Sequence, residues 1–94
     1  MAGFYVYILK SSIDNTLYTG QTNDLKERLK KHNSGRIKST KNKIPYSLVY
    51  FEEYDSRSNA MHREWELKKK WNTQRKLRLI EDFEQRKIAE ILGP

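Results

Sequence analysis

Residues whose side chains could do acid–base and metal chemistry are spread over the first two thirds of this chain of 94 residues. Tyr7 and Tyr18 carry phenol groups that could position or deprotonate a water molecule. Arg28 offers a guanidinium fork for phosphate oxygens, and Glu64 offers a hard oxygen ligand for Mg²⁺. Together with the titratable imidazole of His32, these groups could supply a nucleophilic water, charge stabilisation and help for the leaving oxygen.

A β-hairpin over residues 4–20 is expected to position the two tyrosines. Two runs rich in aromatic and β-branched residues flank a polar break with turn composition, and the second run ends at a glycine. Tyr5 and Tyr7 share one face of the first strand, and Tyr18 on the return strand could lie near Tyr7. The tyrosines fit two interpretations, amphipathic packing on a half-buried sheet or part of a site.

A helix is predicted from the cap residue Asp24 to about Asn33, since Asp24 and Glu27 have the spacing of a capping box. Arg28 and His32 are four residues apart, so they should project together from the edge of the face that packs on the hairpin. Each alone fits a structural role, as a surface ion-pair partner or as a residue near the negative end of the helix dipole. Together, beside two tyrosines, they predict a phosphate site.

Residues 34–43 are polar and basic without apolar periodicity, so we expect an exposed loop. The loop is either a mobile arm that contacts DNA or a solvated connection. The basic side chains of the loop are Arg36, Lys38, Lys41 and Lys43.

Residues 46–54 have a continuously apolar centre, which predicts the central and most buried strand.

A second helix is predicted to run to about residue 71, and Asp55, Ser56 and Ser58 are the candidates for its cap. Its apolar stripe consists of Ala60, Leu67 and Trp71, with Met61 and Trp65 alongside. Glu64 occupies the missing position of that stripe, and an unpaired carboxylate there would cost several kcal/mol. Glu64 is therefore either in a structural salt bridge, with Arg28 as one candidate partner, or a metal ligand that faces the tyrosines.

Asn72 and Thr73 can cap a third helix, and residues 81–94 read as a short helical tail. The junction of the second and third helices is strongly basic. This run is either a solvated face or an extension of a basic footprint for nucleic acid, in which Lys69 is the candidate contact. The cluster comprises Lys68, Lys69, Lys70, Arg75, Lys76 and Arg78.

Composition limits the class of protein. The length fits one domain, and eleven aromatic residues argue against disorder although only 36% of residues are apolar. The absence of cysteine excludes a disulfide framework and a thiolate metal site. No apolar run is long enough to span a membrane, and no signal-peptide pattern is present, so we expect a cytoplasmic protein. The net charge of +7 points to a polyanionic partner, nucleic acid first.

The motifs resemble those of a known family. Tyr5-Val6-Tyr7, with Tyr18-Thr19-Gly20 following, resembles the paired tripeptides that name the GIY-YIG nuclease superfamily. Tyr5 stands where the first glycine usually sits, and Thr19 stands where the second isoleucine does. Residues 17–22, 32–35 and 63–68 are most similar to a small, stand-alone bacterial subfamily of uncharacterised single-domain proteins.

The resemblance covers residues 4–79 and implies an α+β fold, a three-stranded antiparallel sheet flanked by helices. It implies one domain over residues 1–94, with a core at about 4–80 and a helical tail over 81–94.

The resemblance also places residues of this chain on functional positions of the family. By this resemblance Tyr7 and Tyr18 are the motif tyrosines, Gly20 the motif glycine, Arg28 the catalytic arginine, His32 a position often histidine, Glu64 the metal ligand, and Asn72 a candidate for a functional asparagine.

The activity implied is that of an endonuclease on DNA, with repair or recombination as its setting, that uses one Mg²⁺ or Mn²⁺ ion. Tyr7 is our candidate base, with Tyr18 as its partner or a phosphate contact. Close approach of Arg28 and a metal would favour the phenolate. Two other hypotheses stay open, a nucleic-acid-binding module without turnover and a structural protein with a buried polar network. Because the chain is too short for a separate DNA-recognition domain, affinity must come from its own surface or from a partner protein.

Overall fold

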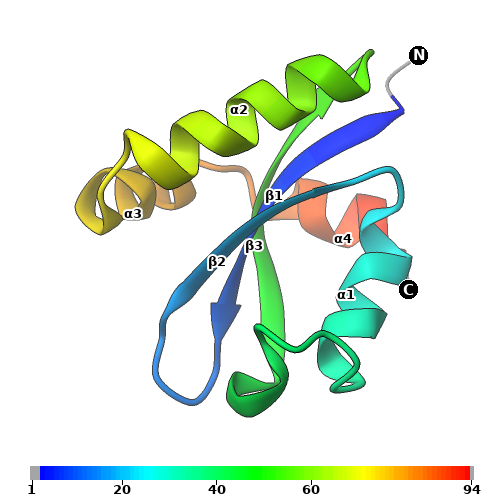
Figure 1. The fold of residues 1–94 in the computed structure, drawn as a ribbon, viewed down its shortest axis with the longest axis vertical. Helices are drawn as coiled ribbons and strands as arrows, with labels where there is room; N and C mark the ends of the chain where they lie inside the picture. Colours follow the sequence, from blue (N-terminus) through cyan, green and yellow to red (C-terminus); the bar gives the residue numbers. More distant parts are fainter. Residues whose placement is uncertain (1–2, 94) are drawn as a thin grey trace.

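The computed structural model describes residues 3–93, which form an α+β fold with one antiparallel sheet (Figure 1). This confirms the fold class predicted from the sequence. The strands are β1 (Phe4–Ser11), β2 (Leu17–Thr22) and β3 (Tyr46–Tyr54), and the helices are α1 (Leu25–Asn33), α2 (Arg57–Lys69), α3 (Thr73–Glu81) and α4 (Arg86–Leu92), with a short 3₁₀ turn at Lys41–Lys43.

The strand order is β2-β1-β3, so β1 is the central strand and the prediction that residues 46–54 form it was wrong. The continuous apolar run of β3 has another cause. The β1–β3 register shifts between Ile8 and Leu9, so that Leu48 and Phe51 of β3 both pair with residues on one face of β1. A bulge of this kind breaks the alternation of apolar and polar positions. Both residues are buried against helices even though β3 lies at a sheet edge.

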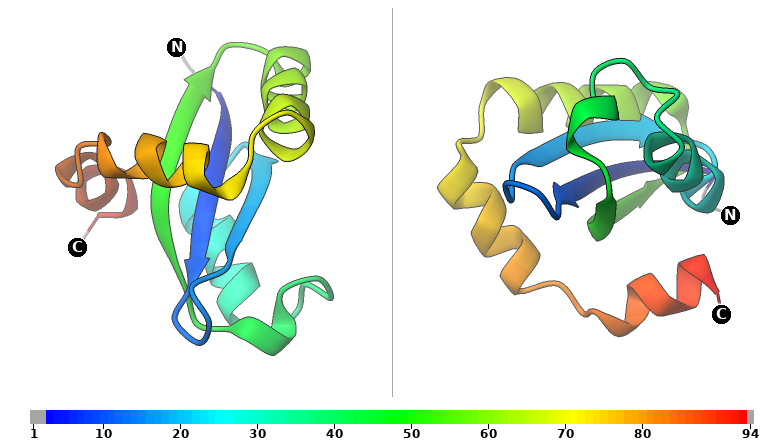
Figure 2. Two further views of the ribbon diagram at one scale, coloured as in Figure 1. Left: turned by 90° about the vertical axis from the view of Figure 1, so that its left-hand side faces the viewer. Right: turned by 90° about the horizontal axis from the view of Figure 1, so that it is seen from below.

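The two faces of the sheet carry separate apolar clusters, and Figure 2 shows α1 and α3 on opposite sides of the strands. On one face Tyr7 and Leu9 of β1 pack with Leu25 of α1, and the apolar side chains of α4 complete this cluster. On the other face Val6 packs with Ala60 and Leu67 of α2, and Leu79 of α3 joins at its border. The strict alternation along β1 therefore assigns each of its residues to one helix layer.

Helix α1 is fixed at both ends. The Asp24 carboxylate accepts a hydrogen bond from the Glu27 backbone N–H at 3.1 Å, as the predicted cap requires. At the other end the Asn33 side chain binds the Tyr46 backbone in both directions, with its Nδ2 3.0 Å from the carbonyl oxygen and its Oδ1 2.6 Å from the amide nitrogen. The last turn of α1 is therefore tied to the start of β3.

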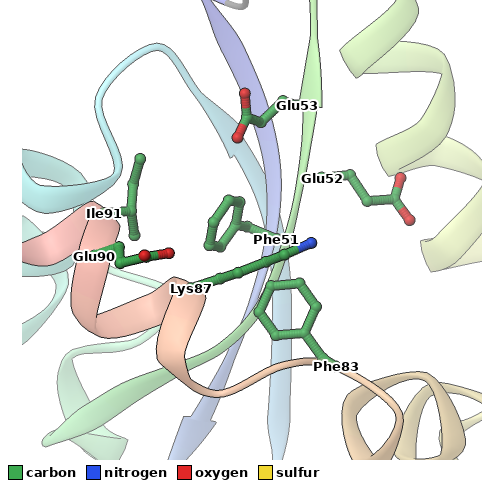
Figure 3. Close-up of a pocket in the computed structure, with 7 residues that line it drawn as sticks. All are labelled: Phe51, Glu52, Glu53, Phe83, Lys87, Glu90 and Ile91. Atoms are coloured by element: carbon green, nitrogen blue, oxygen red, sulfur yellow. The ribbon is translucent and has the colours of Figure 1, made fainter.

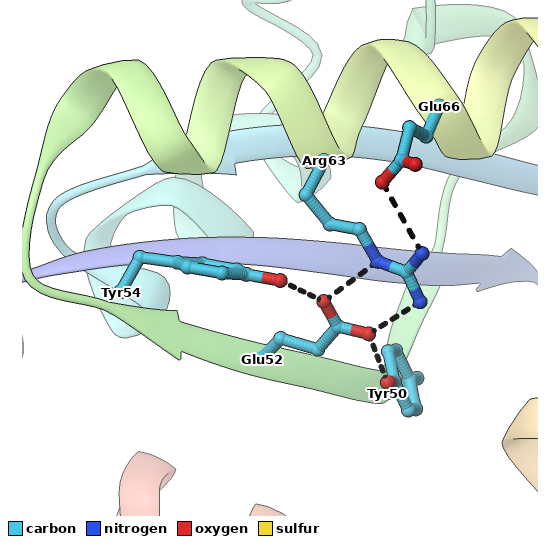
Figure 4. Close-up of polar contacts among 5 residues, drawn as sticks. All are labelled: Tyr50, Glu52, Tyr54, Arg63 and Glu66. Atoms are coloured by element: carbon cyan, nitrogen blue, oxygen red, sulfur yellow. Dashed lines mark hydrogen bonds and ion pairs between the residues drawn. The ribbon is translucent and has the colours of Figure 1, made fainter.

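Helix α2 is anchored to β3 by a polar network (Figure 4). The Arg63 guanidinium forms a two-pronged ion pair with Glu52, with N–O distances of 2.9 and 3.0 Å. The hydroxyl groups of Tyr50 and Tyr54 donate to the same carboxylate, so each oxygen of Glu52 accepts twice. This network fixes the rotation of α2 about its axis.

Two details of α2 differ from the prediction. The helix ends at Lys69 rather than at about residue 71. Met61 and Trp65 are 50% and 48% exposed, so they do not lie beside the buried stripe. The narrow contact of α2 with the sheet explains this difference, since only Ala60 and Leu67 are fully buried along it. Within residues 3–93, no helix combines the length and apolar character needed to cross a membrane.

Candidate active site

The hydroxyl group of Tyr7 is the centre of a buried polar group. Tyr7 is 1% exposed, and its Oη lies 2.9 Å from Nε2 of His32 and 3.3 Å from Nε of Arg28. Both partners lie on α1, four residues apart, so their side chains project from the same side of the helix, as the sequence predicted. Strand β1 and helix α1 thus bring together three of the residues predicted for catalysis.

The imidazole of His32 links Tyr7 to Thr40. Its Nδ1 lies 2.9 Å from Oγ1 of Thr40, whose hydroxyl donates to the Ile37 carbonyl at 3.4 Å. Arg28 can only donate to the Tyr7 oxygen, so within this group the Tyr7 hydroxyl proton finds its acceptor at Nε2 of His32. In that tautomer Nδ1–H donates to Oγ1 of Thr40. The result is a directed chain of hydrogen bonds from Tyr7 through His32 to Thr40.

The electrostatics of the group keep the proton on Tyr7. Burial raises the pKa of Tyr7 to about 12, and the hydrogen bond and charge of Arg28 oppose this rise without cancelling it. Burial also lowers the pKa of His32 to about 4, with the nearby Arg28 charge as a second cause. At neutral pH the resting site therefore contains a neutral phenol and a neutral imidazole. The predicted effect of Arg28 acts in the expected direction but is smaller than that of burial.

Tyr18 has a different position from Tyr7. Its partner in the β1–β2 ladder is Leu9, whereas the partner of Tyr7 is Gly20. The centre of the Tyr18 ring lies 6.4 Å from that of Tyr7 and 4.9 Å from that of the His32 imidazole. Tyr18 is only partly buried and packs on the hydrogen-bonded chain from the side. The structure therefore separates the two tyrosines, with Tyr7 as the one whose oxygen is hydrogen-bonded to His32 and Arg28.

Glu64 reaches the same group from α2. Its charge contributes, as a lesser cause, to raising the pKa of both Tyr7 and Arg28. Its carboxylate pairs with Lys68 one turn along the helix at 2.9 Å, and Lys68 Nζ also lies 5.9 Å from the centre of the Tyr18 ring. The ion-pair partner of Glu64 is thus Lys68 and not Arg28, a pairing whose i, i+4 spacing was visible in the sequence.

Comparison with known proteins identifies the family of this arrangement. The family model of the GIY-YIG catalytic domain matches residues 3–78. The chain belongs to the GIY-YIG family. It is 47% identical over 83 residues to a UPF0213 protein of Staphylococcus haemolyticus, an alignment that covers 87% of this chain and 99% of the relative. A UPF0213 protein of Staphylococcus aureus is 46% identical over the same length and coverage.

A solved structure supports the same assignment. The solution NMR structure of a UPF0213 protein from Bacillus halodurans matches this chain with a TM-score of 0.57 and 34% identity, and the match covers 96% of each chain. The predicted resemblance to small single-domain members of the GIY-YIG family is therefore confirmed. Membership places the chain in a family of nucleases, which act on nucleic acid.

Gly20 lies against the Tyr7 ring, and the remaining predicted site residues of this GIY-YIG domain lie outside the Tyr7 group. The Asn72 side chain caps α3 by accepting from the Arg75 backbone N–H at 2.9 Å, which gives it a structural role. Lys43 forms an exposed ion pair with Asp14 at 3.1 Å. The predicted basic contacts are all exposed, namely Arg36, Lys38, Lys41, Lys43 and Lys69.

Thr40 belongs to the Tyr7 group although the sequence did not indicate it. We expected residues 34–43 to be an exposed loop, and most of them are exposed, but Thr40 is fully buried beneath the imidazole of His32. A single hydroxyl residue in a basic loop carries no periodic signal that could predict this. The segment therefore also completes the site by holding His32.

The donor set suits a metal that keeps most of its water ligands. Among residues 3–93, no group of three or more His, Cys, Asp or Glu side chains is arranged to hold a metal ion. Glu64 is a single carboxylate whose charge acts on Arg28, and Mg²⁺ is commonly held by one or two carboxylates together with water and substrate phosphate. The site fits such an ion, provided that Lys68 releases Glu64.

A pocket of about 530 Å³ between β3 and α4 is not part of this site (Figure 3). Phe51, Phe83 and Ile91 form its apolar wall. Carboxylates outnumber cations around it, since Glu53 and Glu90 are accompanied by Lys87 alone, while the Glu52 carboxylate points away toward Arg63 (Figure 3). Such a charge pattern disfavours a phosphate.

Proposed function

We propose that this GIY-YIG domain is a divalent-metal-dependent endonuclease that hydrolyses phosphodiester bonds in DNA. The observation that supports this most directly is the position of the Tyr7 oxygen between Nε of Arg28 and Nε2 of His32. A buried phenol with a hydrogen-bond donor on one side and a proton acceptor on the other is suited to passing on a proton. A purely apolar core would not need this arrangement.

Tyr7 acts in this proposal as a proton relay. The attacking water forms a bond to phosphorus and gives its proton to the Tyr7 oxygen, while the Tyr7 proton moves to Nε2 of His32. The P–O bond to the leaving oxygen breaks, and that oxygen takes a proton from solvent. Because the Tyr7 oxygen gains one proton as it loses another, the phenol need not ionise fully in spite of its raised pKa. The proton received by His32 then passes to solvent, since burial holds the pKa of the imidazole low.

Arg28 and Glu64 complete the proposed machinery. Since Nε of Arg28 is engaged with Tyr7, its two terminal amino groups are the ones that would bind the non-bridging phosphate oxygens. Glu64 would hold the metal, and Lys68 would then be free to bind a neighbouring phosphate. When bound, a divalent cation activates water and offsets the charge that develops on phosphate.

The polyanion is expected to bind along the exposed basic side chains of residues 36–43 and of the α2–α3 junction. Contacts of this type carry little sequence information, so the domain alone should discriminate weakly between sequences. A partner protein would then supply specificity. If about six phosphates are contacted, log K should fall with a slope of roughly −5 against log salt.

The test is cleavage of labelled single-stranded, duplex, flap and branched DNA in Mg²⁺, Mn²⁺ or EDTA. Tyr7→Phe and Glu64→Gln should each lose metal-dependent cutting by roughly 10²-fold or more. Tyr5→Phe and Glu53→Gln are matched controls, because they change the same residue types outside the Tyr7 group and should keep activity. Cutting that survives in both site variants would refute the assigned roles.

A second candidate function is a binding module without turnover, and the Glu64–Lys68 ion pair is the observation that favours it. In that case Glu64 is a structural carboxylate. Salt-sensitive DNA binding without cleavage of any substrate, unchanged in Glu64→Gln, would decide for this alternative.

A further inference from the structure

The solvent-facing side of α2 carries an aromatic pair that neither core cluster uses. Trp65 is 48% exposed, and its ring lies nearly parallel to that of His62, at 27° and with ring centres 6.0 Å apart. An exposed aromatic surface of this kind, which the core does not use, is a candidate binding site.

The charge around this pair favours an anionic occupant. Nζ of Lys70 lies 5.5 Å from the centre of the Trp65 ring, and Lys69 is exposed on the adjacent turn. An aromatic face bordered by lysines matches a nucleotide, whose base can stack while its phosphate pairs with an ammonium group. A purely apolar protein partner would leave these cations without a counter-charge.

The aromatic pair is also next to the proposed active site. Trp65 follows Glu64 directly and precedes Lys68 by three residues, so Trp65 and Lys68 are neighbours on the helix surface. Lys68 pairs with Glu64 and lies over the ring of Tyr18. Lys68 therefore connects the catalytic carboxylate with the exposed indole within one turn of α2.

We propose that Trp65, extended by His62, is a stacking platform for an unpaired nucleobase of the substrate strand, with Lys69 and Lys70 on its phosphates. In a duplex both faces of a base are covered by its neighbours, so the platform selects DNA with unpaired nucleotides beside the cleaved bond. This inference rests on the proposed function for its ligand class, but it concerns binding and can be tested without cleavage.

The experiment measures binding in EDTA, so that turnover plays no part. A labelled oligothymidylate and a labelled duplex are titrated with wild type, Trp65→Ala and Met61→Ala, and anisotropy gives each Kd. Trp65→Ala should weaken binding of the single strand by about 5- to 100-fold and leave the duplex within roughly twofold. Met61→Ala, which removes an equally exposed side chain, should change both Kd values by less than about twofold.

A second measurement uses Trp71→Phe, which leaves Trp65 as the sole tryptophan. Binding of the oligothymidylate should quench the fluorescence of Trp65 in this variant.

Two results would overturn the platform. One is equal affinity of wild type and Trp65→Ala for the single strand. The other is a dimer in sedimentation that Trp65→Ala converts to monomer, which would make this surface a contact between two copies of the chain. Binding that depends on Trp65, without any cleavage, would support the platform and refute the endonuclease. Cleavage together with binding that does not depend on Trp65 would support the endonuclease and refute the platform.

Discussion

The ring of Tyr7 lies across Gly20, its direct partner in the β1–β2 ladder. A Cβ atom built on residue 20 would come within 2.5 Å of the Tyr7 Oη and 2.6 Å of Cζ, closer than real side chains approach. The glycine is therefore needed for space and not for an unusual backbone angle. It lets the phenol lie flat over β2 and reach His32 and Arg28 on α1.

Gly20→Ala should displace the Tyr7 ring and break its hydrogen bonds. We expect destabilisation by about 1–3 kcal/mol, as for other overpacked cores, and a loss of cleavage on the order of 10²-fold from misplacement of the reacting group. Urea unfolding and the cleavage assay measure the two effects. Gly3→Ala is the control, because nothing lies within 4 Å of the added methyl group. Equal behaviour of the two variants would contradict the role given to Gly20.

The Tyr7 group could be predicted from the sequence because each of its parts has a short-range signal. Alternation along β1 and the i, i+4 spacing of Arg28 and His32 each select one face of an element. The sequence does not give the register between strands. The pairing of Tyr7 with Gly20, rather than with Tyr18, depends on turn geometry and on packing across the whole sheet.

Two other features had no usable local signal. The order of the strands was misjudged because a bulge in β3 gives an edge strand the continuous apolar run of a central one. The burial of Thr40 depends on how a basic loop folds back under His32, which is a tertiary contact. Intrinsic preference and periodicity are weak guides wherever packing between distant segments decides the outcome.

Lys68→Met should free the Glu64 carboxylate and strengthen metal binding. Because the Lys68 ammonium now occupies a carboxylate oxygen at 2.9 Å, its removal should lower the Kd for Mn²⁺ by roughly 3- to 10-fold, equivalent to a surface ion pair of about 1 kcal/mol. Paramagnetic resonance without DNA gives this Kd. Lys69→Met removes the adjacent ammonium and should leave it unchanged. Weaker Mn²⁺ binding in Lys68→Met would mean that the lysine supports the site instead of competing for it.

Arg63→Met should destabilise the protein by on the order of 3 kcal/mol, because Glu52 would remain largely buried without its cation. Urea unfolding measures the loss. Arg86→Met is the control, since the Arg86–Glu84 pair is exposed and should contribute less than about 1 kcal/mol. If the two variants lost the same stability, the network in Figure 4 would not be what anchors α2.

His32 should make stability depend on pH in the acid range. Its pKa is lowered to about 4 in the fold, whereas an unfolded histidine has a pKa of about 6.5. Between these values the unfolded chain binds a proton that the folded chain does not, so this contribution is complete above about pH 6.5 and is lost as the pH falls toward 4. The free energy of unfolding should fall by up to about 1.4 kcal/mol per pH unit more in wild type than in His32→Gln.

His62→Gln alters an exposed imidazole on α2 and should keep the wild-type slope. Parallel curves for wild type and His32→Gln, measured by urea unfolding from pH 7 to 4, would show that the imidazole is not held neutral between Tyr7 and Thr40.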